Sequence, residues 1–122
     1  MVFEFPYHSM IRATRIALGM SQQELADICG FSGNSSICEV ELNVKSISHG
    51  RKTYILDILK SHIRNFSSKK RAFIEYKTAL NLIDIWYQEN GYEKTLPNDY
   101  VKYLLVKQAA WLCYESGEIK DA

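Results

Sequence analysis

The chain has 122 residues, which is enough for one domain or for a small domain with a helical extension. Hydrophobic residues make up 47% of it and charged residues 24%, a composition that excludes a disordered chain. No apolar run approaches the roughly 20 residues that cross a bilayer, and the amino terminus lacks the pattern of a signal peptide. We therefore expect a cytoplasmic protein with no membrane partner.

The net charge of +1 is unevenly distributed along the chain. Residues 1–77 contain 11 Lys and Arg against 7 Asp and Glu, a balance of +4, whereas residues 78–122 contain 4 against 7, a balance of −3. A basic first part could meet phosphate, and an acidic second part could not. This asymmetry is typical of a nucleic-acid reader that carries a separate pairing element.

Two helices are predicted at the start of the chain. Apolar residues recur at helical spacing from Ser9 to Leu18, and Gly19 follows where a left-handed cap is wanted. Ser21 and Glu24 have the spacing of a capping box, so a second helix begins there. It ends at the next glycine, Gly30, and its expected buried side consists of Leu25, Ala26, Ile28 and Cys29.

A turn over residues 31–34 precedes a third predicted helix, which Ser35 or Ser36 caps and whose inward residues include Ile37 and Val40. Asn43 then tolerates positive φ and opens a loop that runs to about residue 50. A fourth helix follows, with the apolar residues Tyr54, Ile55, Ile58, Leu59 and Ile63 in register.

The second half is predicted to be a helical hairpin. Residues 61–71 mix serine, asparagine and basic side chains, so we expect a joint there, and its run Lys69, Lys70, Arg71 is more often a solvated linker than a DNA clamp. One helix then carries the stripe Phe73, Tyr76, Leu80, Ile83 and Tyr87, widened by Leu82, Ile85 and Trp86, and a final helix follows Asn98. The predicted fold is all-α, with one domain over 1–66 and a second over 67–122.

One segment has the pattern of a functional motif: SQQELADICGFSGNSSICEVE. The residues that define the pattern are Ser21, Gln22, Leu25, Ala26, Gly30, Ser32, Ile37 and Glu41. Over residues 9–64 the chain resembles the Cro and lambda-repressor-like (XRE) helix-turn-helix family. Small Ala26 allows a close helix crossing and Gly30 a sharp turn, so the third helix is held outward, where its edge could enter a major groove about 12 Å wide. Asn43 and Ile47 stand where the family usually has Gly and Pro, and one extra residue lies between Gly30 and Ile37.

The resemblance implies DNA contacts at two kinds of residue. Base contacts are assigned to Asn34, Ser35, Ser36, Cys38 and Glu39. Asn34 is the best single reader, because Asn pairs with adenine through two hydrogen bonds. A turn and a helix cap would also account for Asn34, Ser35 and Ser36. Phosphate contacts are assigned to Gln22, which also braces the recognition helix, and to Arg12, Arg15, Lys45, Arg51 and Lys52.

The second half resembles the anti-CRISPR-associated autoregulators, a likeness that includes the tail AAWLCYESGEIKDA. It implies a homodimer that binds an inverted repeat in double-stranded DNA before its own operon and represses it. The expected dimer interface consists of Leu80, Ile83, Trp86, Tyr87, Leu104, Leu105 and Trp111. An antitoxin with a partner protein and an RNA-binding regulator stay open as alternatives.

Catalysis and metal binding are not predicted. The cysteines, Cys29, Cys38 and Cys113, lie far apart inside apolar helical patterns, which favours reduced, buried thiols. No Cys or His pair has zinc-ligand spacing, so we expect no metal and no cofactor. The sequence also lacks a nucleophile elbow, a phosphate-cradling glycine loop and paired carboxylates, so the protein is predicted not to be an enzyme.

Overall fold

The regular structure is helical throughout the computed structural model, which describes residues 6–44, 46–91, 93 and 98; no strand occurs among them. The all-α fold predicted from the sequence is therefore confirmed. The helices are α1 (Tyr7–Ala17), α2 (Gln22–Cys29), α3 (Ser35–Glu41), α4 (His49–Arg64) and α5 (Ser68–Asn90). The expected final helix, with Leu104, Leu105 and Trp111, lies outside the described residues.

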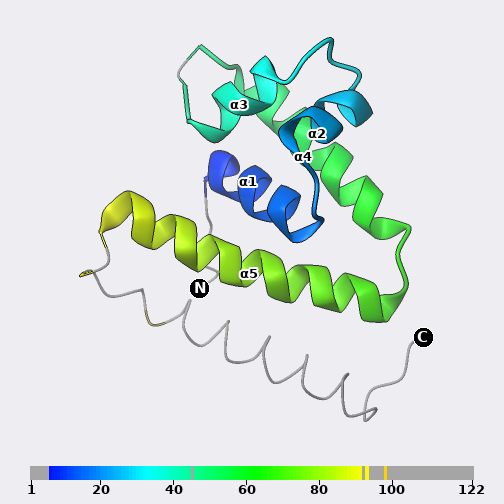
Figure 1. The fold of residues 1–122 in the computed structure, drawn as a ribbon, viewed down its shortest axis with the longest axis vertical. Helices are drawn as coiled ribbons and strands as arrows, with labels where there is room; N and C mark the ends of the chain where they lie inside the picture. The colour runs from blue at the N-terminus through cyan, green and yellow to red at the C-terminus, as the bar shows by residue number, and fades with distance from the viewer. Residues whose placement is uncertain (1–5, 45, 92, 94–97, 99–122) are drawn as a thin grey trace.

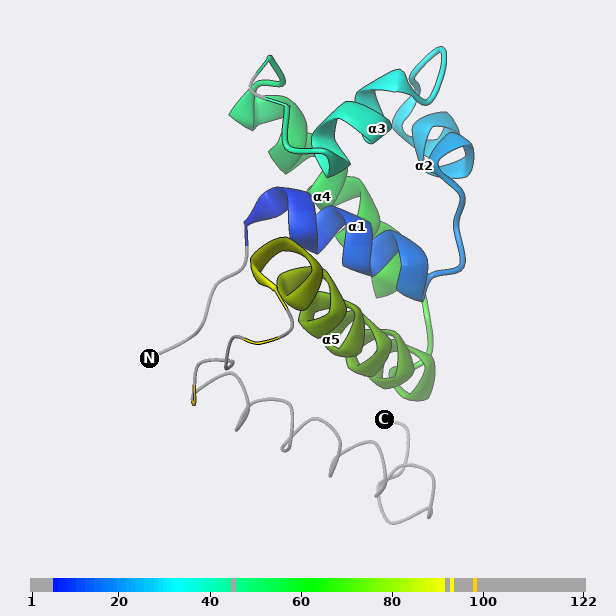
Figure 2. The same ribbon diagram turned by 60° about the vertical axis from the view of Figure 1, so that its left-hand side comes forward.

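Helix α1 is the centre of the arrangement (Figure 1). The long helix α5 packs along one side of it, and α3 and α4 pack against it from the other side. Helix α2 contacts α3 and α4, and the view in Figure 2 shows α2 and α3 at the end of the molecule farthest from α5. No helix of the described residues has the length and apolar character needed to cross a membrane.

The main core lies between α1, α2, α3 and α4, where each helix contributes an apolar side chain with no exposed surface, among them Ile11, Leu25, Ile37, Ile55 and Leu59. These residues follow the helical spacing seen in the sequence. The expectation for Ile28 was wrong, because its side chain is 42% exposed. Position 28 lies about 100° around α2 from the centre of the buried face formed by its neighbours, so it points away from α3 and α4.

Local capping signals produce the predicted helix ends. The Ser21 hydroxyl accepts a hydrogen bond from the Glu24 backbone N–H at 3.0 Å, and the Glu24 carboxylate accepts one from the Ser21 N–H at 3.3 Å, so the capping box is confirmed. Gly30 ends α2 in the left-handed region, at φ +79°. Asn43 has φ +59° and takes the positive φ that was expected of it after α3.

Helix α5 turns a different side to the core than its most regular stripe predicted. Ile74, Ala79, Leu82 and Ile85 are buried, whereas Phe73 and Leu80 are 36% and 37% exposed. Leu82 and Ile85 form a small cluster with Ala13 of α1. The expected joint also shrinks, because α4 continues to Arg64 and α5 begins at Ser68.

Two polar contacts fix the carboxyl-terminal half of α5 to α1. The Asn81 side-chain amide donates a hydrogen bond to the Ala13 backbone oxygen at 3.0 Å. His8, of which only 8% is exposed, lies 2.9 Å from a Glu89 carboxylate oxygen through its Nε2 atom. Together with the apolar cluster, these contacts set the position of α5 along α1.

Candidate nucleic-acid interface

The turn between α2 and α3 is defined by backbone hydrogen bonds at Gly30. The Phe31 N–H donates to the Ala26 carbonyl at 2.9 Å, and the Gly30 N–H donates to the Asp27 carbonyl at 3.1 Å. This pair of bonds closes α2 and redirects the chain, which the left-handed conformation of Gly30 permits. Ala26 has no exposed surface, so its small side chain lies in the packed region between the helices.

Helix α3 has a buried side and an exposed edge. Ile37 and Val40 have no exposed surface and Glu41 only 8%, so these three residues face the core. Five residues form the opposite edge, which we call the α3 edge: Asn34, Ser35 and Glu39 are exposed, and Ser36 and Cys38 are half-buried. The residues expected to contact bases are therefore accessible from solvent.

Asn34, rather than Ser35 or Ser36, occupies the N-cap position of α3. Its side chain nevertheless makes no capping hydrogen bond. Both Ser35 and Ser36 lie in the first turn of the helix, so the predicted serine cap was wrong by one or two positions. Capping does not use the amide of Asn34, which leaves its donor and acceptor atoms free for another partner.

A buried ion pair fixes the other side of α3 to α1. The Arg15 guanidinium donates to both carboxylate oxygens of Glu41, at 2.6 and 2.8 Å, and also to the Met20 backbone oxygen at 2.8 Å. The two charged side chains are only 14% and 5% exposed. Gln22, at the start of α2, donates to Glu41 at 3.3 Å and adds a third helix to the network.

This network changes what is expected of Arg15 and Gln22. Because the Arg15 guanidinium is held by Glu41 and a backbone oxygen, Arg15 acts as a support for α3, and we leave it out of the candidate DNA surface. Gln22 does brace α3, as expected, through its bond to Glu41. Its phosphate contact stays a prediction.

Two cations of α4 lie beside the two ends of the α3 edge. Arg51 donates a hydrogen bond to the Ser36 hydroxyl at 3.3 Å, next to the first turn of α3. Lys52 donates to the Asn43 side-chain oxygen at 3.4 Å, just after the last turn of α3. The exposed edge therefore has a positive charge near each end, and the first residues of α4 supply both charges.

Two aromatic residues, Phe31 and Tyr54, support Arg51. Its guanidinium carbon lies 5.7 Å from the centroid of the Phe31 ring, within the range of a cation–π contact. The rings of Phe31 and Tyr54 are 6.2 Å apart, and the Tyr54 hydroxyl donates to the Cys29 carbonyl at 2.9 Å. The only signal in the sequence was an apolar residue directly after Gly30, which does not reveal a partner 20 positions later.

The other candidate DNA-contact residues are Arg12, Lys45, Glu39 and Cys38. Arg12 is half-buried on α1, and Lys45 lies outside the described residues. Glu39 is exposed in the middle of the α3 edge. Cys29 and Cys38 are free thiols. Burial raises the pKa of the Cys29 thiol, which favours the protonated thiol over the reactive thiolate.

The expected dimer residues on α5 do not share one environment. Leu80 is exposed, whereas Ile83 is half-buried and packs against the cluster of Ala13, Leu82 and Ile85. Trp86 and Tyr87 are half-buried, with ring centroids 5.4 Å apart in an edge-on contact. Of the four, Leu80 offers the most accessible apolar side chain.

Comparisons with protein-family models, with curated proteins and with solved structures found no match to this chain.

Proposed function

We propose that this protein is a sequence-specific DNA-binding regulator in which α2 and α3 form a helix-turn-helix of the Cro and lambda-repressor-like kind. The observation that carries the proposal is the α3 edge: it is exposed, it lies between Arg51 and Lys52, and α1 and α2 brace it from behind through Glu41. A rigid polar helix edge with a cation near each end fits a major groove, which has phosphates along both rims.

Each residue class has a separate part in this recognition. Asn34 pairs with adenine N6 and N7, and Ser35 and Glu39 meet neighbouring base edges. Arg51 and Lys52 attract phosphates without regard to sequence, Arg12 adds to that attraction, and Gln22 donates a hydrogen bond to a phosphate. Because the edge is already braced in the free protein, little conformational freedom is lost when it enters the groove.

The regulator acts in the cytoplasm as a homodimer on an inverted repeat. The acidic second half supports this arrangement, because its negative charge is repelled by phosphate. Leu80 of α5 offers an exposed apolar side chain for pairing. Two recognition helices address half-sites one turn of duplex, roughly 34 to 36 Å, apart. Occupation of a promoter by the dimer then represses transcription by occlusion.

The test begins with selection of bound duplexes from a random pool, which yields the preferred site and its symmetry. We expect Asn34→Ala to reduce the ratio of specific to random-sequence affinity by about 1 to 3 kcal/mol, or about 5- to 150-fold, because the bidentate base contact is lost. Gel-shift titrations with both duplexes measure this ratio.

Two controls accompany this titration. Asn90→Ala makes the same chemical change at the far end of α5 and leaves the ratio unchanged. Arg51→Ala weakens binding to both duplexes and flattens the salt dependence. An unchanged ratio in Asn34→Ala overturns the assignment of the base reader. Selection that enriches no duplex, or binding of RNA in place of duplex DNA, overturns the proposed function.

A further inference from the structure

A second basic surface lies where α4 meets α5. The sequence contains five Lys and Arg and no Asp or Glu between Asp57 and Glu75. All five cations are exposed, and we call this surface the α4–α5 corner: Lys60, Arg64, Lys69, Lys70 and Arg71. Neither of the ion pairs His8–Glu89 and Arg15–Glu41 involves these five cations.

The first turn of α5 concentrates this charge where folding does not favour it. Ser67 caps the helix by accepting a hydrogen bond from the Lys70 N–H at 3.2 Å, and Lys69, Lys70 and Arg71 follow with no acidic residue in that turn. The amino-terminal end of a helix carries a partial positive charge, which repels cations placed there. A bound anion reverses this disadvantage, because it meets the cations and the dipole together.

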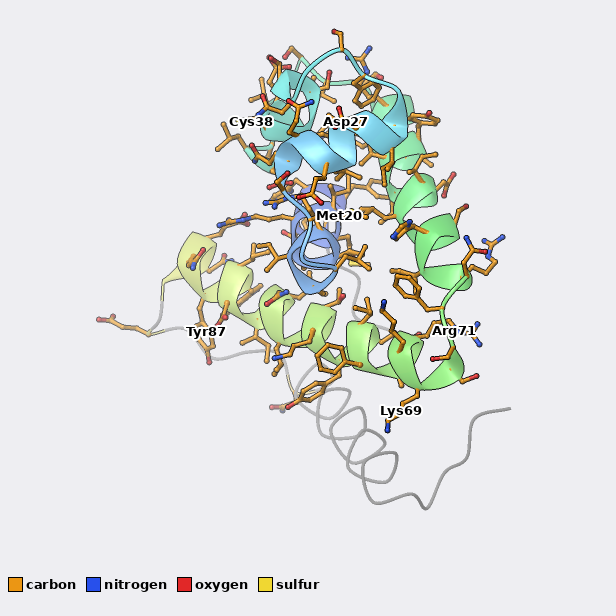
Figure 3. All side chains as sticks on the ribbon, turned by 45° about the vertical axis from the view of Figure 1, so that its right-hand side comes forward. Met20, Asp27, Cys38, Lys69, Arg71 and Tyr87 are labelled. Atoms are coloured by element: carbon orange, nitrogen blue, oxygen red, sulfur yellow. The ribbon has the colours of Figure 1, made fainter. Side chains whose placement is uncertain are left out.

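The corner is separated from the α3 edge by the length of α4. Arg51, beside α3, and Arg64, at the corner, are 13 positions apart on the same helix. At 1.5 Å per residue this is about 20 Å along the axis. In Figure 3 Lys69 and Arg71 lie at one end of the molecule and Cys38 of the α3 edge at the other. The corner is therefore a second basic surface, separate from the α3 edge.

The side chains of the corner indicate the kind of partner. The large hydrophobic side chains that are exposed elsewhere in the described residues are absent between positions 58 and 72. Protein interfaces depend on such apolar and aromatic anchors, whereas binding to a phosphate backbone needs only cations. The Phe66 ring is half-buried, with the Lys70 ammonium 4.0 Å from its centroid and the His62 ring in edge-on contact, so it offers no platform for stacked bases.

We propose that the α4–α5 corner binds the phosphate backbone of a second duplex DNA segment, without reading its sequence, while the α3 edge holds the first. The choice of DNA rests on the proposed function; the charge and the placement of the corner do not. One chain then bridges two segments of duplex. At most five phosphate contacts form, so the second segment is held with a salt slope no steeper than about −4.5 and is released as salt rises.

The test is a bridging experiment with the full chain. A duplex that carries the selected site is immobilised, the protein is bound to it, and a labelled random-sequence duplex is added at low salt. We expect retention of the labelled duplex by the unaltered protein. Lys69→Gln with Arg71→Gln reduces that retention about tenfold and leaves binding of the first duplex unchanged. Lys77→Gln with Gln88→Glu, which changes the net charge equally, retains the labelled duplex.

Two results overturn the inference: equal retention by the corner variant, or equal loss by the matched control, which would mean that only net charge matters. Failure of the proposed function is recognised separately. In an Arg51→Ala, Lys52→Ala background the α3 edge lacks its cations, and random-sequence duplex is bound through the corner alone. Addition of Lys69→Gln and Arg71→Gln to that background then reduces the remaining binding about tenfold, whether or not a specific site exists.

Discussion

Glu41 is buried although it carries a charge, and it accepts hydrogen bonds from Arg15 and Gln22. Taking a carboxylate out of water is costly unless it is paired and its oxygens are satisfied. Both carboxylate oxygens of Glu41 have partners at 2.6 and 2.8 Å. The Arg15–Glu41 pair therefore specifies where α3 lies against α1. Its net contribution to stability is small, because desolvation of the two charges offsets much of their attraction.

Replacement of Glu41 by Gln tests this role at the scale of a single residue. We expect a loss of about 3 kcal/mol in the free energy of unfolding, because the buried Arg15 guanidinium loses its countercharge. Urea denaturation followed by circular dichroism measures the loss. Arg15→Met combined with Glu41→Leu removes both charges and recovers much of the stability. A Glu41→Gln variant as stable as the unaltered protein would show that the pair is solvated.

At the scale of the element, the turn from α2 to α3 depends on one residue with positive φ. Gly30 has φ +79°, and a Cβ atom added there meets nothing within 4 Å. The obstacle to a side chain is therefore the backbone conformation alone, which costs L-residues roughly 1 to 2 kcal/mol. Gly33 lies in the same turn, also with open space around it, but outside the left-handed region.

Gly30→Ala and Gly33→Ala form a matched pair in that turn. The first is expected to lower the free energy of unfolding by about 1 kcal/mol, and the second to leave it unchanged or raise it slightly, by reducing the freedom of the unfolded chain. Thermal unfolding of both variants, scanned side by side, measures the difference. Equal losses would mean that crowding, and not φ, determines the residue at position 30.

At the scale of the whole molecule, α5 is bound to the amino-terminal helices. It packs on α1 through Leu82 and Ile85, and Asn81 and Glu89 bond to α1 residues. The predicted boundary between residues 66 and 67 falls at the turn before this helix, in the connection of residues 65–67. Helix α1 packs on the main core through Ile11 and on α5 through Ala13. Loss of either contact therefore exposes an apolar side of α1.

Coincident unfolding is therefore expected for α5 and the remaining helices. Trp86 lies on α5, and Trp111→Phe leaves it as the only tryptophan of the chain. Its fluorescence and the far-ultraviolet circular dichroism should give one shared urea midpoint. Leu82→Ala should lower the free energy of unfolding by about 2 to 5 kcal/mol and move the midpoints of both signals together. A lower midpoint for the fluorescence alone would establish α5 as a separate unit.

Much of the fold could be predicted because its signals are local. The Ser21–Glu24 box, Gly30 and Asn43 act on backbone groups within a few positions of themselves, so their effect does not depend on the rest of the molecule. The side of α5 that faces α1 could not be predicted in this way. Several stripes of its sequence are apolar, and which one is buried depends on what α1 offers.

The same distinction between local and tertiary signals applies to the α3 edge. The sequence alone determined the five described helices, the ends marked by Ser21 and Gly30, and the outward direction of Asn34 and Glu39, because helical periodicity and backbone hydrogen bonding are properties of short segments. Only the tertiary structure decided that Arg15 supports Glu41, that Arg51 lies beside Ser36, and that five exposed cations share one corner. Contacts between residues 15 or 26 positions apart arise from the packing of helices, and no local pattern in the sequence encodes them.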